Sequence, residues 1–143
     1  MSFQSGEAND APWYSDSTAL SHMTPSEGIL TFKTPYQGTT NVVVGDGATL
    51  PVSHVGQAQL KTSTKPLHLK NVLHVPYLQY KLLSIQQLCN DNNCTVNFDA
   101  SFVYIKGKAT GTTILEGASD RGVYMNSPPF HQAFAILRVF WDT

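Results

Sequence analysis

The chain has 143 residues, of which 41% are hydrophobic and 13% are charged, and this length suffices for one domain with its own core. Nine Lys and Arg against ten Asp and Glu give a formal net charge of −1, and no block of like charges occurs. Because affinity for nucleic acids rests largely on neutralising phosphates, this composition argues against direct nucleic-acid binding.

Residues 1–12 are polar and rich in small side chains, and we expect them to form a flexible lead-in. They lack the basic start and the apolar run of a secretion signal. No stretch of about 18 apolar residues occurs anywhere, so no membrane span is expected. The sequence therefore predicts a cytoplasmic protein.

From Trp13 onward the pattern predicts many short strands separated by turns. Residues 41–44 run into the sequence Gly-Asp-Gly at 45–47, and the returning arm covers residues 50–55. This arrangement is typical of a β-hairpin, because Asp-Gly tolerates the positive φ angles of a tight turn.

Two further strands are expected over residues 57–61 and 66–75, and Pro76 ends the second of them. Apolar side chains at helical spacing then predict one short helix over residues 82–88. Later segments rich in β-formers predict four more strands, at residues 94–98, 102–105, 113–115 and 122–125.

Many short strands with one short helix predict an all-β domain, a small closed or partly closed β-barrel, over residues 13–125. Two adjacent prolines at 128–129 break this pattern. The sequence leaves open whether residues 126–143 form an irregular or short helical tail of the protein or a non-native one.

Cysteine and histidine spacing indicates no cofactor and no metal. Cys89 and Cys94 are separated by four residues and lack the second ligand pair of a structural zinc site, so reduced thiols in the core are favoured over a disulfide or a metal. His22 and His74 have no third ligand at a convincing spacing. We expect both imidazoles to be packed or hydrogen-bonded.

The stretch with the most chemical information is WYSDSTALSH, at residues 13–22. It resembles the active-site loop of retropepsin-like proteases as copia-type LTR-retrotransposon Gag-Pol polyproteins carry it. That loop has a tryptophan, two residues, Asp-Ser/Thr-Gly-Ala, and a histidine three residues after the alanine. The matching positions in this chain are Trp13, Asp16, Ser17, Ala19 and His22.

Other segments resemble the same family in the same order. Residues 43–47 look like the flap hairpin, and residues 69–76 look like the strand written LxNVLHVP. Residues 82–88 look like the helix that follows, and residues 122–124 look like the closing strand. The resemblance spans about residues 13–125, and the ordered set is much more specific than the aspartate loop alone.

The resemblance implies an aspartic endopeptidase that is active as a homodimer and cuts peptide segments of its own polyprotein. Each chain would supply Asp16, and two carboxylates that share one proton would activate water and protonate the leaving amide. Ser17 would hydrogen-bond across the pair, beside Thr18 in the same catalytic loop. The flap over the substrate would consist of Val44, Gly45, Asp46 and Gly47.

Two positions depart from the family pattern and keep a second interpretation open. Thr18 stands where the family usually has glycine, and a displacement of Asp16 by about 1 Å can cost roughly 100-fold in rate. Leu20 stands where serine or threonine is usual. The alternative is a catalytically dead or repurposed barrel that binds peptides or only folds. A nucleic-acid-associated accessory domain is a third hypothesis, and the near-neutral charge argues against it.

Overall fold

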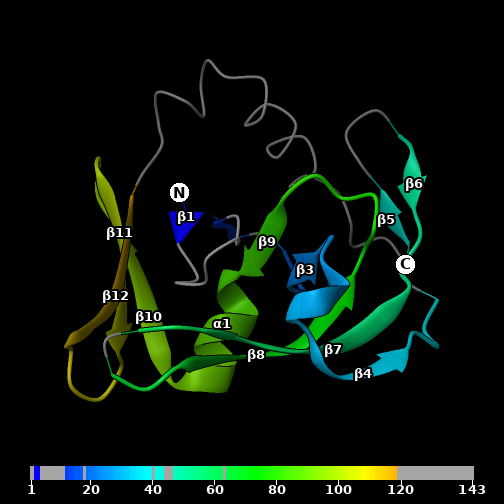
Figure 1. Cartoon of the computed structure of the whole chain (residues 1–143). Coiled ribbons are helices and arrows are strands. Elements are labelled where there is room, and N and C mark those ends of the chain that lie inside the picture. The colour runs from blue at the N-terminus through cyan, green and yellow to red at the C-terminus, as the bar shows by residue number, and fades with distance from the viewer. Residues whose placement is uncertain are drawn as a thin grey trace.

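The structure, a computed structural model, describes residues 2–3, 12–17, 19–39, 41–43, 47–62 and 64–118 (Figure 1). The sequence predictions for Thr18, for residues 44–46, for the strand at 122–125 and for the tail at 126–143 therefore lie outside the described residues.

Most of the described chain is β-strand, which confirms the all-β class predicted from the sequence. Ten strands form one mixed sheet in the order β10-β11-β12-β1-β2-β9-β3-β8-β7-β4. Their bounds are β1 Ser2–Phe3, β2 Trp13–Asp16, β3 Met23–Thr24, β4 Thr31–Pro35, β7 His54–Leu60, β8 Leu67–His74, β9 Lys81–Ser84, β10 Cys94–Phe98, β11 Phe102–Gly107 and β12 Thr113–Ala118.

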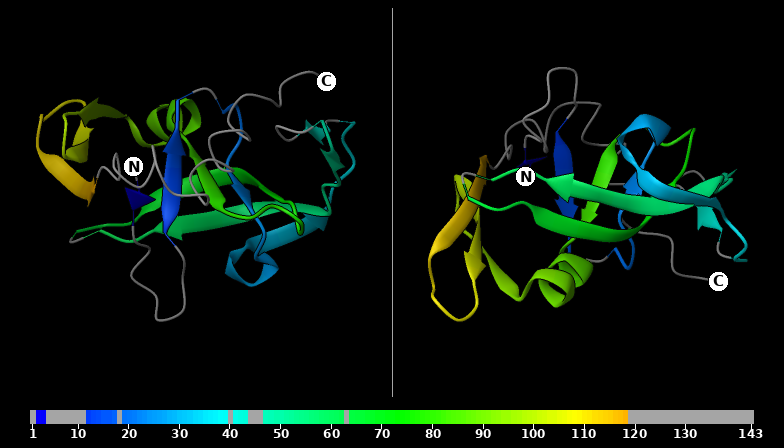
Figure 2. Two further views of the ribbon diagram at one scale, coloured as in Figure 1. Left: turned by 90° about the horizontal axis from the view of Figure 1, so that it is seen from above. Right: turned by 60° about the horizontal axis from the view of Figure 1, so that its bottom comes forward.

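The remaining elements are a separate two-stranded hairpin and two short helices, namely β5 Val42–Val43, β6 Thr49–Leu50, the 3-10 helix η1 Glu27–Ile29 and α1 Ile85–Asn92. Figure 2 shows the β10–β11–β12 meander at one end of the molecule and the β5–β6 hairpin at the other. Within the described residues the strand order has two ends, β10 and β4, and no pairing between them closes a barrel.

Two parallel pairings bring distant parts of the chain together in the middle of the sheet. Strand β2 runs parallel to β9, and β3 runs parallel to β8 while also meeting β9. The segment between β2 and β3 therefore starts and ends beside β9. This segment contains the aspartate loop.

The only α-helix of the described residues, α1, begins at Ile85, so the expected start at Leu82 was wrong. Leu82 and Leu83 lie in β9, where both are fully buried. A short apolar run suits a strand covered on both faces as well as it suits a helix, and periodicity cannot separate the two. Ser84 is the N-cap, and Asn93 ends the helix in the left-handed conformation.

Side-chain amides of α1 form hydrogen bonds with the backbone of β8. The Asn92 amide donates to the His68 carbonyl and accepts from the His68 N–H, both at 2.8 Å. The Gln87 amide donates to the Lys70 carbonyl. With eight residues, α1 is too short to cross a membrane, and no other helix in the described part of the chain is long enough.

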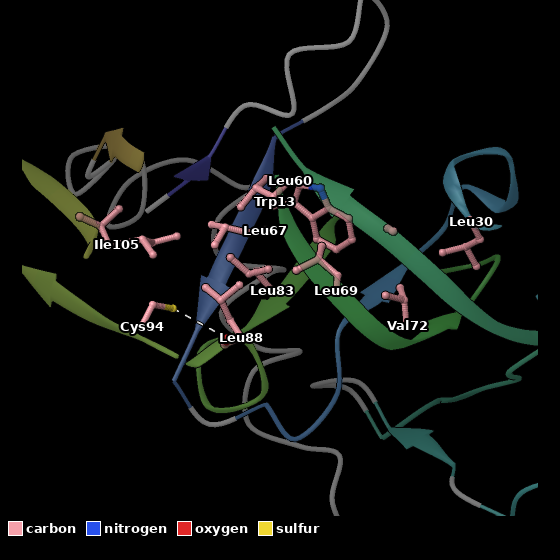
Figure 3. Packing of buried hydrophobic residues seen from close by; sticks show 12 residues of the cluster. Trp13, Leu30, Leu60, Leu67, Leu69, Val72, Leu83, Leu88, Cys94 and Ile105 are labelled. Atoms are coloured by element: carbon pink, nitrogen blue, oxygen red, sulfur yellow. Dashed lines mark hydrogen bonds between the residues drawn. The ribbon is translucent and has the colours of Figure 1, made fainter. Parts of the chain in front are cut away.

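The buried apolar side chains form two clusters, and Figure 3 shows the larger one around the indole of Trp13. The Cys94 thiol lies in this cluster and donates to the Leu88 carbonyl at 3.8 Å. Burial raises the pKa of Cys94 to about 12. Cys89 and Cys94 are both free thiols, as the sequence predicted.

Candidate active site

Asp16 is the last residue of β2 and is only 2% exposed. In the parallel pairing of β2 with β9, it lies opposite Ser84, the last residue of β9. The next residue, Ser17, is exposed. The candidate carboxylate is thus buried at the end of a strand, just before the segment that leads to His22.

Ser84 forms two hydrogen bonds with the loop that follows Asp16. Its hydroxyl donates to the Ala19 carbonyl at 2.6 Å, and its backbone N–H donates to His22 Nδ1 at 2.9 Å. The same hydroxyl accepts from the Gln87 N–H at 3.2 Å as the cap of α1. One buried serine therefore connects the aspartate loop, the end of β9 and the start of the helix.

His22 is fully buried and acts as a hydrogen-bond acceptor. Burial lowers the pKa of its imidazole from 6.5 to about 4, because the charged form is poorly solvated there. Accepting from Ser84 requires an unprotonated Nδ1, which agrees with a neutral ring. The sequence-based expectation of a packed or hydrogen-bonded His22 is confirmed.

Trp13 starts the same strand that ends in Asp16, and it is 1% exposed. The ammonium of Lys81, its partner on β9, lies 4.9 Å from the centre of the indole ring. A cation over an indole face is attracted by the ring quadrupole. Strand β2, which carries Asp16, is therefore held by the core packing of Trp13 at its start and by pairing with β9 along its whole length.

The described part of the predicted hairpin consists of β5 and β6, and its returning arm is shorter than the expected residues 50–55. Val42 pairs with Leu50, and Val43 pairs with Thr49. Gly47, which lies between these two strands in the sequence, has a φ of 89°, a conformation that favours glycine. The other flap residues lie outside the described part of the chain.

The base of this hairpin and the aspartate loop share the second core cluster. Val42 and Ala19 are both fully buried in it, together with Met23, Leu73, Val75, Leu78 and Leu82. The hairpin is therefore anchored beside the loop that follows Asp16.

Ser84 was not among the residues predicted from the sequence to belong to the site, although a signal was present. Serine at the N-cap followed by Gln87 three residues later is the spacing of a capping box, which marks a helix start. That signal would have moved the helix start to Ile85. The link from Ser84 to His22 joins residues 62 positions apart, and no local pattern predicts it.

We expect Ser84→Ala to lower the free energy of unfolding by about 1 to 2 kcal/mol, because it removes the helix cap and leaves the Ala19 carbonyl without its donor. Chemical denaturation of the full chain measures this loss. The matched control is Ser26→Ala, because Ser26 precedes η1, is exposed and makes no side-chain cap bond. If both variants lost a similar free energy of unfolding, the hydrogen bonds of the Ser84 hydroxyl would not be the cause of the loss.

Comparison with known proteins agrees with this architecture. Residues 13–94 match the family model described as Pol polyprotein, beta-barrel domain. The chain is 38% identical over 112 residues to the retrovirus-related Pol polyproteins from transposons RE1 and RE2 of Arabidopsis thaliana. No solved structure matches the chain.

The chain belongs to the family of retrotransposon Pol polyprotein beta-barrel domains. The aligned residues make up 78% of this chain and only 8% of either relative. The chain therefore spans a small part of the length of the curated relatives that it matches.

Proposed function

We propose that this domain is an aspartic endopeptidase that works as a homodimer and cuts peptide segments of its own polyprotein. The observation that carries the proposal is the position of Asp16, a buried carboxylate at the end of β2, just before a loop that is hydrogen-bonded to Ser84. A reacting group must be held within a fraction of an ångström of its productive position. The hydrogen bonds of Ser84 and the parallel pairing of β2 with the buried strand β9 support that rigidity here.

In the proposed chemistry, Asp16 of one chain and Asp16 of its partner share one proton. The ionised carboxylate takes a proton from a water molecule that attacks the peptide carbonyl. The protonated carboxyl supplies the proton that the leaving nitrogen needs. The two groups titrate as one pair, because like charges so close together cannot both ionise easily. The exposed hydroxyl of Ser17 is available for a hydrogen bond to the second chain.

A second candidate function is a non-catalytic domain that binds peptide or serves only as a folded module. The observation that favours it is the 2% exposure of Asp16, which limits access to the carboxylate within a single chain. Thr18 and Leu20 favour it too, because they replace the family's usual residues. In the protease, dimer formation or movement of the β5–β6 hairpin must open a path for substrate.

Cleavage of a broad peptide library at about pH 5, where such a dyad is singly protonated, separates the two candidates. The proposal expects cleavage by the wild type that is lost in Asp16→Asn and kept in Asp91→Asn. The second variant is the matched control, since it makes the same change on α1.

A third variant, Thr18→Gly, tests the departure from the family pattern. Cleavage by Thr18→Gly but not by the wild type would identify a protease disabled at this residue. Lack of cleavage by all variants, in protein shown to be folded and dimeric, would overturn the peptidase proposal in favour of the non-catalytic domain.

A further inference from the structure

Three side chains of metal-ligand type meet on the side of the sheet where η1 approaches β7 and β8. They are Glu27 in η1, His54 at the start of β7 and His74 at the end of β8. One ligand atom from each residue lies within 4.8 Å of the ligand atoms of the other two. None of these residues takes part in the aspartate loop described above.

The strand register brings the two histidines together. His54 and His74 are direct partners in the antiparallel pairing of β7 and β8, and side chains of such partners lie on one face of a sheet. Their rings stack with centroids 5.7 Å apart and planes inclined by 28°. Strand β4 pairs with β7, the strand that carries His54. Because η1 directly precedes β4 in the chain, Glu27 also lies near the two histidines.

The buried imidazole of His74 indicates that a ligand belongs here. His74 is 7% exposed, and its Nδ1 is buried without a hydrogen-bond partner among the described residues. A buried polar atom without a partner destabilises the folded state, so such an atom calls for an explanation. A metal ion bound by the imidazole is one way to satisfy it.

His54 shows the arrangement that surrounds ligands in metal sites. Its Nδ1 lies 2.8 Å from the Ser53 hydroxyl. When this nitrogen donates its proton to Ser53, Nε2 carries the free lone pair that a metal requires. In metal sites, a hydrogen bond from the ring nitrogen that does not bind the metal fixes the tautomer and the orientation of the ligating histidine.

We propose that Glu27, His54 and His74 form a binding site for a divalent metal ion of the Zn²⁺ class. Two imidazole nitrogens and one carboxylate oxygen are a usual ligand set for Zn²⁺, and three protein ligands leave a fourth position for water. Ligand atoms about 2.0 to 2.1 Å from a tetrahedral ion lie about 3.4 Å apart, so the site must contract slightly. Glu27 is exposed and can supply this movement.

Lys33 is the competitor that the ion has to displace. Its ammonium donates to Glu27 Oε2 at 3.2 Å, and both side chains are partly exposed. The hydrogen bond and the charge of Lys33 hold the pKa of Glu27 below its ordinary value. Ion pairs this exposed contribute little stability, and the pair can open when a dication arrives.

Calorimetric titration of the full chain with Zn²⁺ tests the site. The wild type is expected to bind one ion per chain. Loss of a ligand in Glu27→Gln or His54→Gln should weaken binding by more than the roughly 10- to 100-fold typical of second-shell changes. Neither of these residues is fully buried, so both variants are expected to fold, and circular dichroism checks this.

Two further variants test whether binding depends on this cluster of side chains. His68→Gln removes an exposed histidine of β8 that lies outside the cluster, and it should leave the affinity unchanged. Lys33→Gln removes the competing ammonium and should tighten binding. Zn²⁺ should also raise the Tm of the wild type but not that of His54→Gln, because an ion that binds only the folded state stabilises it. Equal affinity in the wild type and His54→Gln, or no binding by the wild type, would overturn the proposal.

Discussion

Replacing Trp13 with alanine is expected to lower the free energy of unfolding by about 3 to 5 kcal/mol, the usual range for deleting a large buried aromatic side chain. Trp13 is 1% exposed and lies among Leu60, Leu69 and Leu83 in the larger core cluster (Figure 3). Deleting the indole leaves a cavity beside the strand that carries Asp16. Urea unfolding followed by far-ultraviolet circular dichroism measures the loss without relying on tryptophan fluorescence.

Tyr77→Ala is the matched control for the change at Trp13, because it also removes an aromatic ring. Tyr77 is 75% exposed, so its replacement should change the free energy of unfolding by no more than about 0.5 kcal/mol. Similar losses in the two variants would contradict the role of Trp13 as the centre of the core.

Protonation of His22 is expected to destabilise the fold by about 3 kcal/mol between neutral pH and about pH 4. The pKa of this imidazole is lowered from 6.5 to about 4 in the folded chain. Between these values the unfolded chain binds a proton at His22 and the folded chain does not. Acid therefore favours the unfolded state throughout this window, and stability rises with pH until about 6.5.

The contribution of His22 is isolated by comparison with His22→Asn, measured by urea unfolding at several pH values from 4 to 7.5. Asparagine carries no titrating group but retains an oxygen that can accept from the Ser84 N–H. All other titrating groups are common to both chains, so the difference between their stability curves reports His22. Curves of equal slope would show that His22 does not titrate as described.

This pH dependence affects the assay of the proposed peptidase. A dyad that works near pH 5 operates inside the window in which His22 weakens the fold. Low activity at that pH can therefore arise from partial unfolding. Circular dichroism at the assay pH distinguishes this cause from an inactive site.

Local patterns predicted part of the strand order, but they missed β3 and β4. The expected strand at residues 94–98 coincides with β10, and Pro76 follows soon after the end of β8, as expected. The hairpin of β5 and β6 also followed from local turn chemistry. These features depend on neighbouring residues alone, since alternation and turn residues act within a few positions.

Features that depend on pairing between distant strands could not be predicted in this way. The apolar pair Leu82 and Leu83 indicated a helix but lies in a buried strand beside β2. The bond from Ser84 to His22 also requires that pairing. The same limit applies to the metal site proposed above: sequence spacing indicated no metal, because His54 and His74 meet only through the register of β7 and β8.

Mixed dimers test most directly the proposal that Asp16 acts as one half of a pair across a homodimer. Wild-type and Asp16→Asn chains are mixed in equal amounts, allowed to exchange partners, and assayed for peptide cleavage at constant total concentration. Activity is predicted to fall to about a quarter of that of the pure wild type, because random pairing leaves this share of wild-type dimers. A fall to only about half would mean that each chain works alone, and it would contradict the shared dyad.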